Sequence, residues 1–497
     1  MQNRMKSMSI NRKRRAGVLL HPTSLPGQLK NGDIGHQAYR FIEFLHNSGF
    51  KVWQMLPLGP PHDDKSPYQC LSSHAGNPLL ISLDWLVDNG WLDLTLIKLP
   101  ESSDGYRFAC LKHAAKSFYQ MSSDKWINEL SEFEQKHAYW LDDYALFMAL
   151  KGQHENKPWY EWPENIRHRD VGSLNEARQV LADVVKQIIF EQFVFFRQWH
   201  EIRIYAKTHQ IELFGDMPIF VARDSADVWA QRDNFLIDQD GNMPVVAGVP
   251  PDAFSETGQR WGNPLYDWEY MQSTDFSWWK ERFETQLELF DIIRIDHFRG
   301  LQACWQIPEA NDTAENGSWV EVPGTNMLDA LFEAFEYMPL VAEDLGIITD
   351  PVIELKQRYD LPGMKVLQFA FDGSNSNPHM PHRHEKEDLI YTGTHDNDTT
   401  LGWINNKENY NANWLEEYLD VDTDLVDKAF FSIIRSAMAS VSFLCMLPMQ
   451  DILMLGTSAR MNLPGTIGGN WEWRFDWKDV NQDKVRKIER LMVLYQR

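Results

Sequence analysis

The sequence has 497 residues, of which 43% are hydrophobic and 24% are charged, a composition typical of a folded globular protein. Its 48 lysines and arginines against 71 aspartates and glutamates give a net charge of −23, which repels phosphate backbones and anionic lipids. Nucleic-acid and membrane partners are therefore not expected, whereas a neutral ligand would not be affected by this charge.

The four cysteines, at positions 70, 110, 304 and 445, are far apart, and no two of them form a C-x-x-C pair. This spacing favours separate thiols in a reducing compartment over a zinc site or a redox disulfide. No apolar run is long enough for a membrane span, and the basic stretch 12–15 lacks an apolar signal core. We therefore predict a cytoplasmic chain whose first residues form a solvated tail.

Short apolar runs that end in polar or turn-forming residues recur along the chain and predict strands. Few of their residues are charged, which is typical of strands buried on both faces of a parallel sheet. The eight runs are 17–22, 52–58, 212–219, 292–296, 340–344, 365–371, 389–394 and 445–450. Helical patterns lie between most of them, so we predict an α/β fold, a (β/α)8 TIM barrel. A doubly wound sheet is the alternative, but no glycine-rich phosphate turn follows the first strand.

The spacing of the runs predicts two insertions into the barrel. The second and third runs are separated by many more residues than one crossover needs, and we predict a mostly helical insertion over 66–210. It should contain amphipathic helices at 132–150 and near 174–207, the latter starting with a capping box formed by Ser173 and Glu176. A second insertion is expected over 228–290, with a lid loop near 247–264. We treat residues 1–497 as a single catalytic barrel domain.

Three of the predicted strands, the fourth, fifth and seventh, end in acidic residues: Asp296, Glu343 and Asp396. The strands of such a barrel deliver their last residues to the same face, so these carboxylates should converge on one cavity. A single acid at such a position often caps the following helix, but three in this arrangement, two of them beside a histidine, favour catalysis. Arg294 lies two residues before Asp296 and points to the same side of the strand, where its charge would help keep that carboxylate ionised.

The order Arg-x-Asp, Glu and His-Asp on these strands resembles the α-amylase clan of glycosidases. Longer motifs, in order along the chain, are similar to those of the 4-α-glucanotransferases, also called amylomaltases or disproportionating enzymes. They are His21-Pro-Thr-Ser-Leu-Pro26, Ser66-Pro-Tyr68, Gly215-Asp-Met-Pro-Ile-Phe220, Ser255-Glu-Thr-Gly-Gln-Arg-Trp-Gly-Asn-Pro264, Arg294-Ile-Asp-His-Phe-Arg-Gly300 and Asn462-Leu-Pro-Gly-Thr466. The resemblance extends from about residue 15 to the C-terminus. One of these motifs, 215–220, lacks the histidine usual in α-amylases, as is typical of the amylomaltase branch.

This resemblance implies a retaining enzyme that transfers α-1,4-glucan segments from a maltodextrin donor to the 4-hydroxyl of glucose or another maltodextrin. It makes Asp296 the nucleophile, Glu343 the acid/base catalyst and Asp396 the stabiliser of the transition state, with a covalent glycosyl-Asp296 intermediate. Hydrolysis by the same carboxylates is the alternative function. A third hypothesis, a non-catalytic glucan-binding protein, is disfavoured because all three carboxylates are present.

The resemblance also implies substrate-binding residues. Tyr68 would be an aromatic platform for the donor glucose, His297 and Asp372 would contact substrate, His395 would hold sugar hydroxyls beside Asp396, and Trp261 would lie on the lid over the cleft. From the residues alone, Tyr68 could be structural, Asp372 could belong to a turn, and Trp261 could be buried against the helical insertion.

No cofactor or metal is expected, because the histidines lack zinc spacing. The stretch 420–424 starts like a calcium loop, but Leu425 and Phe431 occupy positions that need glycine and glutamate. The expected partners are maltodextrins, glucose as acceptor and other α-1,4-glucans, with no obligate protein partner.

Overall fold

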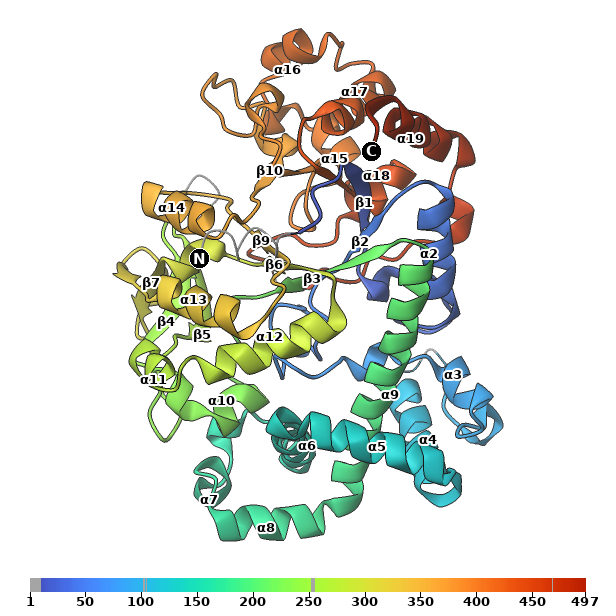
Figure 1. Ribbon diagram of the computed structural model, residues 1–497, viewed down its shortest axis with the longest axis vertical. Coiled ribbons are helices and arrows are strands. Elements are labelled where there is room, and N and C mark those ends of the chain that lie inside the picture. Colours follow the sequence, from blue (N-terminus) through green and yellow to red (C-terminus); the bar gives the residue numbers. More distant parts are fainter. Residues whose placement is uncertain (1–9, 102, 104, 252–254, 467) are drawn as a thin grey trace.

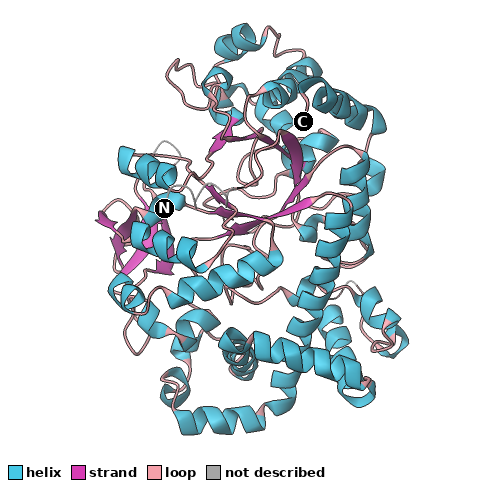
Figure 2. Cartoon of the chain, viewed as in Figure 1, coloured by secondary structure: helices cyan, strands magenta, loops and turns pink. Residues whose placement is uncertain are grey.

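The computed structural model describes residues 10–101, 103, 105–251, 255–466 and 468–497. Eight parallel strands form one sheet in the order β10–β11–β12–β1–β2–β3–β6–β9. The strands are β1 (Arg15–Leu19), β2 (Val52–Gln54), β3 (Glu212–Met217), β6 (Ile292–Ile295), β9 (Leu340–Ala342), β10 (Met364–Val366), β11 (Leu389–Tyr391) and β12 (Leu444–Pro448). The two edge strands, β9 and β10, also approach each other: the N–H of Ala342, in β9, donates to the carbonyl of Pro362, just before β10 (2.9 Å). The sheet thus curves into a nearly closed barrel (Figure 2), and the predicted fold class is confirmed.

Alternating side chains of these strands enter two different apolar cores. One cluster draws residues from seven of the strands, which can touch one another only inside the barrel; its members include Val52, Phe214, Ile292, Val341, Met364, Leu389, Tyr391, Leu444 and Met446. Their neighbours in sequence belong to the larger cluster, which faces the surrounding helices; these neighbours include Trp53, Leu213, Ile293, Leu340, Ile390 and Cys445, and β1 adds Ala16 and Val18. Both faces of the sheet are therefore buried, which explains the continuous apolar runs in the sequence.

Helices follow most of the strands and cover the outside of the barrel (Figure 1). Outside the first insertion they are α2 (His36–Asn47), α10 (Ala226–Ala230), α11 (Trp268–Ser273), α12 (Ser277–Leu289), α13 (Gly324–Ala334), α14 (Asp350–Arg358), α15 (Thr400–Asn405), α16 (Ala412–Leu419), α17 (Val426–Ala439), α18 (Met449–Leu453) and α19 (Gln482–Tyr495). Between β10 and β11 the described chain has only 3-10 turns, so this crossover lacks the α-helix of the ideal repeat.

The chain between β2 and β3 is mostly helical, and Figure 1 shows its helices α4 to α8 gathered at one end of the molecule, joined to the barrel by α9. The helices are α3 (Leu83–Asp88), α4 (Tyr106–Met121), α5 (Asp124–Lys136), α6 (Ala138–Gln153), α7 (Glu164–Arg167), α8 (Val171–Val180) and α9 (Ala182–Thr208). The predicted helix at 132–150 is in fact two helices that meet at His137. The predicted capping box is wrong, because Asp170 caps α8 by accepting from the Ser173 N–H (2.8 Å), which leaves Ser173 inside the helix.

The predicted lid loop is largely a β-hairpin, which corrects the sequence prediction. β4 (Val245–Val249) and β5 (Gln259–Pro264) are antiparallel, and β7 (Ala303–Pro308) and β8 (Ser318–Glu321) extend them into a second sheet of order β5–β4–β7–β8. Gly258 closes the hairpin in the left-handed region (φ 69°), where a Cβ would meet the carbonyl of Val249 at 2.4 Å. Because β7 and β8 come from beyond β6, local sequence does not reveal this pairing. Residues 252–254 lie outside the described part of the chain.

The basic stretch near the start of the chain is not a solvated tail. The Arg14 guanidinium donates to the main-chain carbonyl of Ser440 (2.7 Å), and Arg15, the first residue of β1, pairs with Glu212 (2.8 Å). These contacts form because the barrel begins at Arg15 and its first strand is buried. The four cysteines are unpaired. Within the described ranges, no helix is both long and apolar enough to cross a membrane.

The close approach of β3 to Phe290, two residues before β6, gives a first prediction. A Cβ on Gly215 would meet the buried ring of Phe290 at 2.2 Å, so Gly215→Ala should destabilise the barrel by about 1–3 kcal/mol through overpacking. Thermal unfolding followed by circular dichroism should give a lower midpoint. Gly152→Ala is the matched control, since a Cβ there meets nothing within 4 Å and alanine favours the helix. Equal midpoints for the two variants would contradict this account.

Candidate active site

The inward-facing positions of the barrel change from apolar to polar at the carboxyl ends of the strands. Asp216 is the next inward residue after Phe214, Arg294 the next after Ile292, and Glu343 the next after Val341, because side chains alternate along a strand. Asp216 and Arg294 are also direct partners in the pairing of β3 with β6. The barrel therefore carries a layer of charged side chains above its apolar interior.

A buried arginine joins two carboxylates in this layer. Arg294 Nη1 lies 2.5 Å from Asp216 Oδ2, and Nη2 lies 2.8 Å from Asp296 Oδ1. Burial alone would lower the pKa of Arg294, but the attraction of Asp216 and Asp296 outweighs it and raises that pKa well above its ordinary value. The Tyr68 hydroxyl donates to the same Asp216 oxygen (2.8 Å). Tyr68, Asp216, Arg294 and Asp296 thus form one connected chain of polar contacts.

Glu343 has a drier environment than Asp296. Its side chain is buried, with Oε2 accepting from the His297 N–H (2.7 Å) and Oε1 from the Leu345 N–H (3.0 Å). Burial and the nearby charge of Asp296 raise the pKa of Glu343 to about 7, against the opposing effects of Arg294 and these amides. His297 adopts a left-handed backbone conformation (φ 51°) immediately after Asp296. The two neighbouring acids therefore have different surroundings: Asp296 is ion-paired and 28% exposed, whereas Glu343 is buried and able to hold a proton near neutral pH.

The third acid, Asp396, lies in the loop that follows β11. His395 Nε2 is 3.3 Å from Asp396 Oδ2, and the Asn462 side-chain amide donates to Oδ1 (2.6 Å). Loss of solvation by the surrounding protein raises the pKa of Asp396, but the charge of His395 and the hydrogen bonds from His395 and Asn462 outweigh this effect and lower that pKa to about 2. The side chain remains 47% exposed, so a charged carboxylate faces open space at neutral pH.

Two groups of aromatic rings include residues next to these carboxylates. Tyr68 stacks on His395, with ring centroids 5.2 Å apart, and Trp471 lies 6.0 Å from Tyr68 and 5.9 Å from His395. In a second group, the ring of Trp261 meets that of His297 edge to face at 4.9 Å. The half-buried Trp261 lies on strand β5 and not in a loop, and it also contacts Phe220.

Of the residues singled out in the sequence, Asp372 alone has no described contact that links it to this group. It is exposed, and its carboxylate accepts from the Ser374 N–H (2.8 Å), as in a turn. Its role as a substrate contact stays a prediction.

Sequence reasoning did not single out three members of the site: Asp216, Asn462 and Trp471. Asp216 had a usable signal, since it is an acid in the second half of the predicted strand 212–219. Asn462 lies in one of the motifs that carried the resemblance, but nothing local marks its contact with Asp396. Trp471 is one of 20 tryptophans, and its φ of 64° and its two ring neighbours are visible only in the fold.

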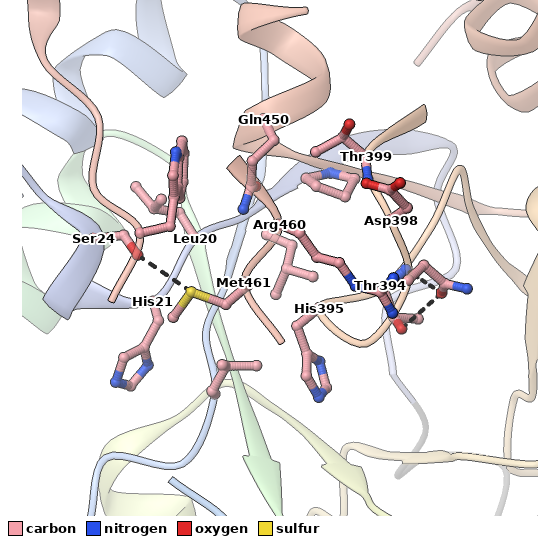
Figure 3. Close-up of a pocket in the computed structure, with 15 residues that line it drawn as sticks. Leu20, His21, Ser24, Thr394, His395, Asp398, Thr399, Gln450, Arg460 and Met461 are labelled. Atoms are coloured by element: carbon pink, nitrogen blue, oxygen red, sulfur yellow. Dashed lines mark hydrogen bonds between the residues drawn. The ribbon is translucent and has the colours of Figure 1, made fainter. Parts of the chain in front are cut away.

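A small cavity lies behind His395, and none of the three carboxylates lines it (Figure 3). His21 and His395 point to the same side of it, and Arg460 and Met461 close another part. Burial, with His395 nearby, lowers the pKa of His21 to about 3, so this histidine is neutral.

Within the described ranges, no three His, Cys, Asp or Glu side chains are grouped as metal ligands would be.

An ion-paired carboxylate beside a protonatable one, at the carboxyl end of a parallel barrel, defines an enzyme class with nucleophilic and acid/base chemistry of the glycosidase type. A model of the 4-alpha-glucanotransferase family matches residues 20–479. The chain is 46% identical to the 4-alpha-glucanotransferase of Thermus thermophilus, over 92% of this chain and 94% of that one, and 44% identical to that of Synechocystis sp., over 94% and 95%. An amylomaltase from Streptococcus agalactiae, solved in complex with acarbose, superposes with a TM-score of 0.93 at 35% identity and covers 98% of this chain and 100% of its own. The chain belongs to the 4-alpha-glucanotransferase family and is an enzyme of that kind.

The electrostatic coupling of the two neighbouring acids gives a second prediction. The negative charge of Asp296 raises the pKa of Glu343, so Asp296→Asn should lower that pKa below about 7. Infrared difference spectra taken across a pH titration measure the Glu343 carboxyl, which is assigned by its loss in Glu343→Gln. Asp372→Asn, an exposed aspartate without contact to Glu343 among the described residues, is the control and should leave the titration unchanged. A Glu343 pKa that stays the same or rises in Asp296→Asn would show that the two acids are not coupled in this way.

Proposed function

We propose that this enzyme moves α-1,4-glucan segments from a maltodextrin donor to the 4-hydroxyl of glucose or a maltodextrin acceptor by a retaining double displacement. The observation that carries the proposal is the pairing of Asp296, ion-paired with Arg294, with the buried and protonatable Glu343 on the neighbouring strand. A retaining mechanism needs one carboxylate that attacks and one carboxyl that gives up a proton.

In the first step, an Asp296 carboxylate oxygen attacks the anomeric carbon of the donor while the bond to the leaving oxygen breaks. Glu343 gives its proton to that oxygen, so the reducing-end part of the donor leaves as an alcohol and the glycosyl part remains as an ester of Asp296. The Arg294 guanidinium, 2.8 Å from Asp296 Oδ1, holds the attacking carboxylate in place.

In the second step, Glu343 is a carboxylate and takes the proton of the acceptor 4-hydroxyl as that oxygen attacks the anomeric carbon. The ester bond to Asp296 breaks, and both acids return to their initial states. The ionised Asp396 accepts hydrogen bonds from sugar hydroxyls and stabilises the positive charge that develops on the ring in each step. Water in place of the acceptor would give hydrolysis, the alternative function.

Aromatic residues near the carboxylates support a glucan site. Tyr68, held by Asp216 and backed by His395, offers a ring face for the donor sugar, and aromatic faces bind the C–H faces of sugars while excluding water. His297, directly after Asp296 in sequence, contacts Trp261 of β5, and we assign the β4–β5 hairpin as the lid over the acceptor. Asp372 is kept as a candidate for more distant substrate contacts.

We further propose that residues 1–497 act as one catalytic barrel domain, with the insertions 66–210 and 228–290 as parts of it. A cytoplasmic location stays a prediction that rests on the four separate cysteines. The reaction as written needs no metal or cofactor, since the residues named above supply every proton and the nucleophile.

The third prediction tests transfer against hydrolysis. Maltotriose alone should give glucose and a ladder of longer maltodextrins, because each bond that is broken is re-formed on another sugar. Chromatography of the products and a reducing-end assay should show that the number of reducing ends stays nearly constant. A steady rise in reducing ends that matches the release of glucose would make the enzyme a hydrolase.

The fourth prediction concerns Trp261. An aromatic contact at a binding site is worth about 0.5–1.5 kcal/mol beyond the area that it buries, so Trp261→Ala should weaken acceptor use roughly three- to tenfold and raise the share of hydrolysis. Trp319→Ala is the matched control, because Trp319 lies on β8 of the same small sheet and contacts Arg299 and Trp305 instead of the site. The ratio of transfer to hydrolysis and the melting temperature are measured for both variants. An unchanged ratio with a large loss of stability in Trp261→Ala would assign this tryptophan to the core.

A further inference from the structure

A short stretch near the end of the chain, residues 459–462, holds the loop that carries Asp396. The Asn462 side-chain amide donates to Asp396 Oδ1 (2.6 Å), and the Arg460 guanidinium donates through Nη2 to the main-chain carbonyl of the same aspartate. The Nε of Arg460 donates in turn to the main-chain carbonyl of Asn462 (2.6 Å). Figure 3 shows Arg460 lying between the backbone beside Met461 and the loop that carries Thr394 and His395. The side chain and the backbone of Asp396 are therefore held by one stretch.

The stretch 459–462 is itself fixed to the barrel. The Gln450 side-chain amide, on α18 directly after β12, donates to the carbonyl of Ala459 (3.2 Å). The Trp471 N–H donates to the carbonyl of Met461 (2.8 Å), and the Met461 side chain is buried against Leu19 and Leu56. The backbone that carries Asn462 is therefore held in place by these contacts.

The other groups near Asp396 do not fix the plane of its carboxylate, which therefore depends on Asn462. His395 approaches the other carboxylate oxygen at the longer distance of 3.3 Å, and its ring is also occupied in stacking on Tyr68. The further charged or titratable groups that act on Asp396 are Arg294, Arg460 and Tyr68, of which Arg460 contacts its main chain. Among the described residues, Asn462 is the only recorded hydrogen-bond partner of Oδ1. With 47% of the side chain exposed, packing alone does not fix the plane of this carboxylate.

We propose that Asn462 is a positioning residue for the reaction: its amide N–H fixes the plane of the Asp396 carboxylate, and Arg460 locks the two residues into one unit. The inference rests on the proposed role of Asp396 as the stabiliser of the transition state. An amide suits this position because it donates a hydrogen bond to a carboxylate without adding charge. A carboxylate of the same shape would face Asp396 as a like charge, and one of the two would then take up a proton at a higher pH than either acid does alone.

This difference between amide and carboxylate gives the test. In Asn462→Asp, the two acids share a proton at about pH 5, so that one can still donate to the other, whereas at about pH 8 both are ionised and repel each other. The kcat of Asn462→Asp for maltotriose disproportionation, divided by that of the unaltered enzyme, should therefore rise several-fold from about pH 8 to about pH 5. Asn462→Ala, which lacks the donor at every pH, should lower kcat roughly ten- to hundredfold at both values, with a much smaller change in KM.

Two further variants separate the possible outcomes. Asn470→Asp places the same charge nearby, on a residue that hydrogen-bonds Leu463 and Thr466, and its kcat ratio should not change with pH. Asp396→Asn should be inactive at both values. A pH-independent ratio for Asn462→Asp, or an unaltered kcat in Asn462→Ala, would overturn the positioning role while Asp396→Asn stays inactive. Substantial activity in Asp396→Asn would instead overturn the proposed role of Asp396. Because the kcat ratio of each variant to the unaltered enzyme is compared between two pH values, a modest loss of stability that is the same at both does not mimic the expected result.

Discussion

The buried guanidinium of Arg294 is the constraint on which the arrangement of the site depends. It lies between Asp216 and Asp296 at the carboxyl ends of two neighbouring strands, where an unpaired charge would be strongly unfavourable. Removing one partner from a buried ion pair typically costs about 3–5 kcal/mol, so the cation and its two carboxylates fix one another. Tyr68 joins the same group through Asp216, and the orientation of a ring in a distant loop is thereby tied to that of the proposed nucleophile.

Three carboxyl groups of similar intrinsic acidity acquire different properties from their neighbours. Asp296 faces the cation of Arg294. Glu343 is buried, and its pKa rises to about 7, although two main-chain amides and the same arginine favour its charged form. Asp396 has a histidine and an amide as partners, and its pKa falls to about 2. The proposed division of roles follows from these environments: a carboxylate that attacks as nucleophile, an acid that keeps its proton until it is transferred to the leaving oxygen, and an anion that stays charged throughout.

The parts of this structure that local sequence determines were predictable. Short, continuous apolar runs with few charged residues predicted all eight barrel strands, and the acids at strand ends predicted the position of Asp296 and Glu343 on neighbouring strands. The pairing of β4 with β7 was not predictable, because these strands lie on opposite sides of β6 in the sequence and their register depends on the folded barrel. The helix cap was misassigned for a local reason, since Asp170 and Ser173 are both good caps and only the backbone shows which one starts the helix. Contacts such as that between Asn462 and Asp396, 66 residues apart in sequence, leave no periodic signal.

The charged residues of the site and its aromatic residues come from elements that differ in how freely their sequence and conformation can change. Asp216, Arg294, Asp296 and Glu343 lie on or directly after barrel strands, whose register is fixed by hydrogen bonds and by packing on both faces. Tyr68, Trp261 and Trp471 come from three segments that are far apart in sequence and lie outside the barrel strands. In the proposed mechanism, cleavage of the donor bond depends on the first set and on Asp396, whereas the choice between water and a sugar hydroxyl depends on how well the second set covers the covalent intermediate. In a barrel of this kind, an enzyme that transfers and one that hydrolyses can therefore share every carboxylate and differ mainly in the segments around the rim.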